Sequence, residues 1–117
     1  MDLADLVRSL LERDTLSARQ WVADAIAEGL CLSDLPQPPG LSATGLAVAA
    51  GVAELLAGRM GQAAPPWTAA VPACPEPLYL VEAAATMPRL RRLCETGGPE
   101  PLRRRRLFAP PEFLSVA

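Results

Sequence analysis

Apolar residues near the N-terminus recur with the period of an α-helix. Between residues 2 and 13 they fall three or four positions apart, which places them on one face of an amphipathic helix. They are Leu3, Leu6, Val7, Leu10 and Leu11. Acidic residues in the first turn and Arg13 in the last match the helix dipole. We therefore expect a first helix with a single buried stripe.

The next segment predicts a second helix, over 18–28. Ser17-Ala18-Arg19-Gln20 has the form of a capping box, so we expect the helix to begin at Ser17. Gly29 is a suitable stop. The buried stripe consists of Trp21, Val22, Ala25 and Ile26. Because three residues separate the two helices, they should form a helical hairpin.

The segment 43–60 is apolar on almost every side. A proline-rich connection over 35–41 precedes it, and either Ser42 or Thr44 can cap the helix. A helix that is hydrophobic all round is usually buried. We expect this helix to form the centre of the domain.

A long break follows at 61–77, with five prolines around Trp67. Loops of this length without a secondary-structure pattern are often functional. Two interpretations of Trp67 remain open. It either pins the loop onto the core or anchors a partner protein.

The C-terminal third combines short elements with many arginines. Leu78–Val81 is strand-like but too isolated to imply a sheet. A helix beginning at Thr86-Met87-Pro88, with Thr86 as the cap, should place Leu90, Leu93 and Cys94 on one side and two arginines on the other. A short Arg-rich helix from Pro99 through Arg106 comes next. Phe108, Phe113 and Leu114 then close the chain around Pro110-Pro111.

Taken together, these elements predict an all-α fold. We expect a compact single-domain bundle of four to six helices with a long proline-rich loop, spanning residues 1–117. Thirteen prolines divide the chain into short helices, and β-branched residues are few.

The composition excludes several kinds of chemistry. The chain has no His and no Lys, so it lacks the commonest general base and metal ligand, and it can form neither a catalytic triad nor a Schiff base. Its glutamates show no paired spacing, and salt bridges explain them more simply. We expect no catalytic activity, no cofactor and no metal.

Cysteines and the N-terminus indicate the compartment. Cys31, Cys74 and Cys94 are scattered and odd in number, which favours buried free thiols in a reducing cytoplasm. The first residues are acidic, unlike a secretory signal, and the apolar stretch 46–58 is too short to span a bilayer. We expect a cytoplasmic protein without membrane contact.

Charge is distributed unevenly along the chain. Residues 1–85 carry four arginines and ten acidic residues, a net −6, whereas residues 86–117 carry seven arginines and three acidic residues, a net +4. A basic segment on an acidic body suggests an anionic partner.

Three interpretations of Arg103, Arg104, Arg105 and Arg106 remain open. They form a solvated turn that pairs with the acidic N-terminal helices, dock onto an acidic patch of another protein, or bind nucleic acid. Successive arginines point all round a helix and form no flat phosphate-binding face. The chain also lacks recognised nucleic-acid-binding motifs.

Four stretches resemble a family of small helical bacterial proteins that are encoded beside a nucleotidyltransferase-like protein. They are ARQWVADA (18–25), LAVAAG (46–51), PPWT (65–68) and PLRRRRLFAPPEFL (101–114). This pairing resembles toxin–antitoxin modules in which the transferase modifies RNA and the small partner restrains it. The resemblance implies an antitoxin-like binding protein whose Arg-rich segment meets the acidic, metal-binding pocket of the transferase. A helical nucleic-acid-binding regulator and a structural adaptor are the alternatives.

We accordingly expect residues 99–117 to form a partner-docking element. In this hypothesis Arg103–Arg106 steer the partner, while Phe108 and Phe113 anchor it. Replacing the four arginines with serine should then leave the melting temperature nearly unchanged, because surface ion pairs contribute little.

Overall fold

The computed structural model describes residues 2–115, so Met1 and the last two residues of the segment 99–117 lie outside the described residues. The chain is mostly helical and compact, with 57% helix and 4% strand. Its α-helices are α1 (Leu3–Leu11), α2 (Thr15–Ala27), α3 (Ala43–Arg59), α4 (Pro88–Gly97) and α5 (Glu100–Arg103). Short 3-10 helices are η1 (Leu32–Asp34), η2 (Pro66–Ala70) and η3 (Glu82–Ala85), and the strands are β1 (Leu78–Tyr79) and β2 (Leu107–Phe108).

The predicted helical hairpin at the N-terminus is confirmed, with one correction. Helix α1 buries the expected stripe except for Leu11, which is half-buried, and α2 packs against it. However, α2 begins at Thr15 instead of Ser17, because the Asp14 carboxylate caps it by accepting from the Ser17 amide at 3.1 Å. The capping-box prediction was therefore wrong: the observed cap, Asp14, lies three residues before Ser17. Ile26, expected in the stripe, is exposed.

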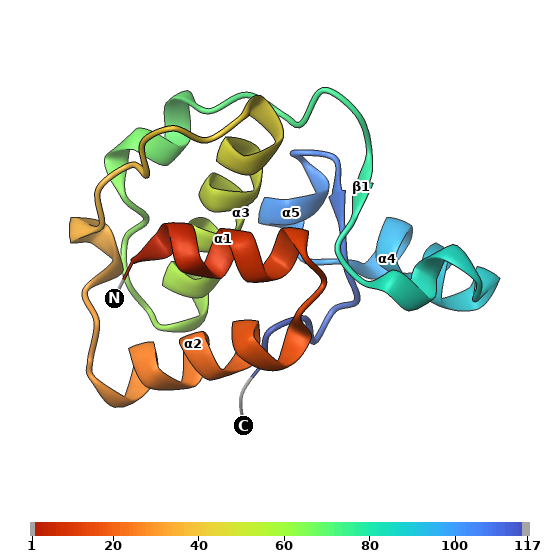
Figure 1. The fold of residues 1–117 in the computed structure, drawn as a ribbon, viewed down its shortest axis with the longest axis horizontal. Coiled ribbons are helices and arrows are strands. Elements are labelled where there is room, and N and C mark those ends of the chain that lie inside the picture. The colour runs from red at the N-terminus through yellow and green to blue at the C-terminus, as the bar shows by residue number, and fades with distance from the viewer. Residues whose placement is uncertain (1, 116–117) are drawn as a thin grey trace.

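Helix α3 lies at the centre of the fold, as predicted. Ser42 caps it by accepting from the Gly45 amide, and eleven of its seventeen residues are buried. Figure 1 shows α1, α2 and α5 arranged around α3. Gly51 allows α5 to approach closely, since a Cβ there would lie 3.0 Å from the Leu102 side chain.

The proline-rich segment 61–77 is less irregular than its sequence suggests. It contains η2, which packs against α3. The Thr68 hydroxyl is buried and donates to the carbonyl of Pro65 at 2.9 Å. The segment is thus held against the central helix.

Leu78–Val81 does take part in a sheet, contrary to expectation. Strand β1 pairs in parallel with β2, with Leu78 opposite Leu107. The Leu78 amide donates to the Arg106 carbonyl at 3.0 Å, and the Leu80 amide to the Phe108 carbonyl at 2.9 Å. The partner strand lies almost thirty residues away in sequence, so no local sequence pattern predicts the pairing.

Helix α4 extends with η3 from the body of the molecule (Figure 1). The Thr86 cap was wrong: Met87 occupies the cap position, and the Thr86 hydroxyl turns back to the Ala83 carbonyl. Within Pro88–Gly97, Cys94 alone is buried. We call α4 together with η3 and the residues between them the arm (82–97).

The arm joins the body at a close backbone contact. A Cβ at Gly98 would lie 2.5 Å from the carbonyl oxygen of Ala109 and 2.7 Å from that of Cys94. Such distances admit no side chain, so glycine is required here for packing. Among the helices of residues 2–115, none has the length and apolar character needed to cross a membrane.

Candidate functional site

The four consecutive arginines do not share one helix. Helix α5 ends at Arg103, not at Arg106 as expected, and a turn carries the chain through Arg104–Arg106 into β2. Arg106 adopts φ +63°, which ends any helical continuation. As a result the four side chains do not form one face: Arg104 and Arg105 share Glu54, and Arg103 and Arg106 each bind other groups.

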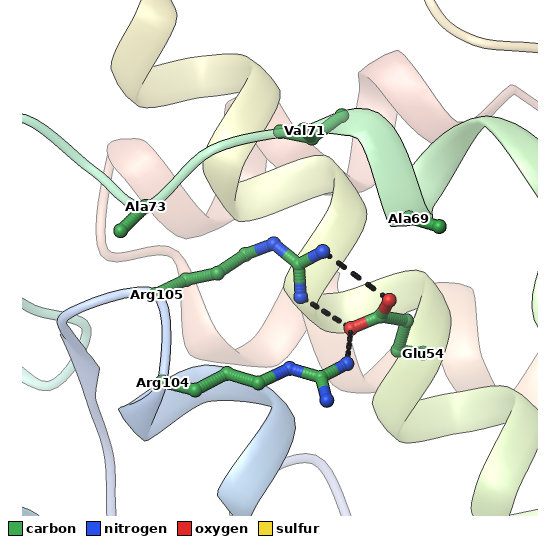
Figure 2. A pocket seen from close by; sticks show the side chains of 6 residues that line it. All are labelled: Glu54, Ala69, Val71, Ala73, Arg104 and Arg105. Carbon is green, nitrogen blue, oxygen red and sulfur yellow. Dashed lines mark hydrogen bonds and ion pairs between the residues drawn. The ribbon is translucent and has the colours of Figure 1, made fainter.

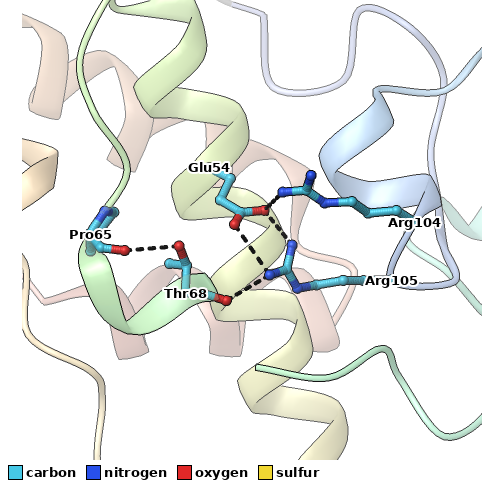
Figure 3. A network of polar contacts seen from close by, with 5 residues as sticks. All are labelled: Glu54, Pro65, Thr68, Arg104 and Arg105. Carbon is cyan, nitrogen blue, oxygen red and sulfur yellow. Dashed lines mark hydrogen bonds and ion pairs between the residues drawn. The ribbon is translucent and has the colours of Figure 1, made fainter. Parts of the chain in front are cut away.

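Arg105 is buried and forms an ion pair with Glu54 of α3. Its two amino groups donate to both carboxylate oxygens of Glu54, and one of them also donates to the Thr68 carbonyl at 2.7 Å. Arg104 donates to the same carboxylate from the solvent side (Figure 3). The side chains of Arg105 and Glu54 are 6% and 11% exposed. This network ties α3, η2 and the turn after α5 together.

Two opposing effects act on the Glu54 carboxyl. Burial by itself raises its pKa, but hydrogen bonds from Arg105 and Arg104 and the charge of Arg105 lower it further than burial raises it. The net pKa lies below the ordinary value, so Glu54 is ionised at neutral pH.

The other two arginines of the run bind backbone carbonyls. Arg103 donates from Nε to the Gly98 carbonyl at 2.7 Å and from Nη1 to the Thr96 carbonyl at 3.3 Å, at the end of α4. Arg106 donates to the Pro75 carbonyl at 2.9 Å. The run therefore pairs with Glu54 and with carbonyl groups, and of the three open interpretations the pairing with the acidic N-terminal helices was wrong.

The aromatic residues proposed as anchors lie largely within the fold. Phe113 is 5% exposed and belongs to the core. Phe108 is half-buried, and its ring centroid lies 5.2 Å from that of Tyr79. The Trp67 indole donates to the Leu35 carbonyl at 2.8 Å, and its ring packs against the core. This geometry matches the interpretation in which Trp67 pins the proline-rich segment.

Arg59 holds the segment 111–113 against α3. It donates to the carbonyl of Phe113 and, at 3.1 Å, to that of Pro111. Burial of this guanidinium lowers its pKa. Phe113 thus has both its ring and its backbone engaged inside the fold.

The arm presents a different surface. Arg89 and Arg92 lie three residues apart and are exposed. In residues 2–115 neither has a carboxylate within ion-pair distance. Leu93, four residues after Arg89, is 43% exposed, and Met87 at the start of the helix is 53% exposed. We call Met87, Arg89, Arg92 and Leu93 the arm surface.

A polar cluster supports the arm at its base. The Arg91 guanidinium lies 4.8 Å from the centre of the Tyr79 ring and 3.5 Å from the Glu95 carboxylate. The Tyr79 hydroxyl donates to Glu95, and this hydrogen bond raises the pKa of Tyr79. Arg91 is therefore engaged within the molecule, in contrast to Arg89 and Arg92.

The sequence contained a signal for the arm surface. The spacing of Leu90, Leu93 and Cys94 against Arg89 and Arg92 defined two sides of α4. On the apolar side only Cys94 is buried within Pro88–Gly97, and Leu93 is 43% exposed. The run at 103–106 is more conspicuous in sequence, yet it is largely engaged within the fold.

The three cysteines are free thiols. Cys74 and Cys94 are buried as expected, whereas Cys31 is exposed. Burial raises the pKa of the Cys94 thiol.

Comparison of the chain with protein-family models, curated proteins and solved structures found no significant match.

Proposed function

We propose that this protein is a non-catalytic binding protein that docks onto an acidic surface of another protein through the arm surface. In the role implied by the resemblance, that partner is a nucleotidyltransferase, which the protein restrains as an antitoxin does. The proposal moves the centre of docking from residues 99–117 to α4.

The observation that carries the proposal is that Arg89 and Arg92 are exposed and have no acidic partner among residues 2–115. Arginine is enriched at binding hot spots because its planar guanidinium pairs with carboxylates in two parallel hydrogen bonds. Two such side chains one helical turn apart favour an acidic partner surface.

Leu93 and Met87 add the apolar part of the surface. Each leaves about half of its surface exposed to solvent. Leu93 lies one helical turn after Arg89, and an exposed apolar side chain with exposed arginines on the same helix has the composition of an interface centre with a polar rim. Phe113 and Arg105 are buried and contribute to docking only by supporting the fold.

Binding of nucleic acid is the second candidate, because unpaired arginines also suit phosphate groups. The two candidates differ in their response to salt. Binding to nucleic acid weakens steeply as salt rises, in proportion to the number of phosphates contacted. An interface that buries Leu93 and Met87 should retain much of its affinity, since burial of apolar surface does not depend on screening.

Co-expression with the product of the adjacent gene, followed by size-exclusion chromatography, tests the proposal. Replacing Arg89 and Arg92 with serine should weaken the complex at least tenfold, chiefly through slower association. The control replaces Arg8 and Arg19 on the N-terminal helices, which removes the same charge and should leave affinity nearly unchanged.

Equal weakening by both variants would show a general charge effect and contradict docking through the arm. Absence of a complex between the unaltered proteins would contradict this choice of partner. Tight binding to RNA that vanishes at high salt would favour the second candidate.

A further inference from the structure

The ion pair of Glu54 borders a cavity of about 350 Å³. Its walls are the small side chains of Ala69, Val71 and Ala73, facing Glu54, Arg104 and Arg105 (Figure 2). The cavity lies on the body of the molecule and includes no residue of the arm surface. It therefore requires an explanation separate from docking.

Charge in this cavity is unbalanced. One carboxylate faces two guanidinium groups, which leaves a net charge of about +1 at the cavity. Arg104 reaches Glu54 through a single nitrogen, and its side chain is 53% exposed. Its remaining N–H groups have no acceptor among the described residues.

Hydrogen-bond donors are also in excess. Arg105 Nε is buried and has no acceptor among residues 2–115. In Figure 2 both amino groups of Arg105 point to Glu54, while Nε lies on the opposite side, towards the segment that carries Val71 and Ala73. A buried donor without an acceptor is destabilising, because it has lost its hydrogen bonds to water. The ion pair with Glu54 alone does not account for this donor.

We infer that this cavity, lined by Arg104 and Arg105, binds a small oxyanion, a phosphate or carboxylate group. Such a group supplies oxygen acceptors for the unused N–H groups and neutralises the excess positive charge. Guanidinium groups are the side chains best suited to this, because they present several donors in one plane. The small walls leave room for the anion beside Glu54.

Titration with inorganic phosphate tests this inference. Sodium phosphate and sodium acetate are each added to the protein at constant ionic strength, with sodium chloride as the reference, and the melting temperature is followed. A ligand that binds the folded state raises the melting temperature in a saturable manner. Saturation with phosphate alone identifies phosphate as the ligand class, and saturation with both identifies oxyanions in general.

Two variants locate the site. Arg104→Gln should raise the dissociation constant about tenfold, because it removes one charged donor from the cavity. Arg8→Gln is the matched control, since Arg8 is also exposed and also paired with a carboxylate, at 2.7 Å from Asp5, on a different helix. It should bind phosphate as the unaltered protein does. Equal affinity in the two variants, or no saturation with either anion, would overturn the inference.

Discussion

Helices α3 and α4 differ in how many of their residues the fold buries and in how their charged side chains are paired. Eleven of the seventeen residues of α3 are buried, whereas Cys94 alone is buried in Pro88–Gly97. The single charged side chain in the middle of α3, Glu54, is held by two arginines, while Arg89 and Arg92 of α4 have no acidic partner in residues 2–115. Helix α3 organises the fold, and helix α4 exposes most of its side chains to solvent.

Removal of a glutamate from each helix should give the largest contrast. Glu54→Ala leaves Arg105 buried without its carboxylate, which should lower the free energy of unfolding by about 3–5 kcal/mol. The control is Glu95→Ala in α4, whose pair with Arg91 is exposed, and it should cost about 0–1 kcal/mol. Urea unfolding measures both. Similar losses in the two variants would contradict the contrast between the helices.

Truncation of a leucine in each helix tests packing in place of charge. Leu55 of α3 is 7% exposed, and Leu55→Ala should cost about 2–5 kcal/mol because it leaves a cavity in the core. Leu93→Ala in α4 should cost roughly 1 kcal/mol, since about half of that side chain is already in water. Thermal unfolding followed by circular dichroism measures the difference. An unchanged melting curve for Leu55→Ala would remove Leu55 from the core.

Acid should lower the stability that the ion pairs of Glu54 contribute, by less than the substitutions above. Because the pKa of Glu54 is lower in the folded state than its ordinary value of 4.5, its contribution to stability is complete above about pH 4.5 and is lost as the pH falls through the folded-state pKa. Glu54→Gln removes this contribution at every pH. We expect the stability difference between the two proteins to narrow from pH 7 to pH 3 in urea unfolding. A constant difference would show that the charge of Glu54 contributes nothing.

The helices with strong periodicity were predictable from sequence. The stripe of α1 and the central position of α3 follow from local patterns that the fold does not override, and the observed cap, Ser42, was one of the two candidates. The start of α2 was predicted two residues late because Asp14 and Ser17 are both good caps, and spacing alone does not choose between them.

Long-range contacts account for what the sequence did not reveal. The pairing of Leu78 with Leu107 depends on how the chain between them folds, and no hydrophobic periodicity in the sequence predicts it. The four arginines look equivalent as a run, but their partners are set by the end of α5 and by the positive φ of Arg106. Serine in all four positions should therefore lower the melting temperature through Arg105, which revises the expectation from surface ion pairs.

The close backbone contact at Gly98 has a consequence for how this chain can evolve. A side chain at this position would collide with the carbonyl oxygens of Ala109 and Cys94, so natural variants should keep glycine there. Most side chains of the arm, by contrast, are exposed, so their identity can change in evolution without loss of packing and can adapt to a different partner. Substitutions in the arm can thus change the partner that it binds, while Gly98 preserves the contact between the arm and the body.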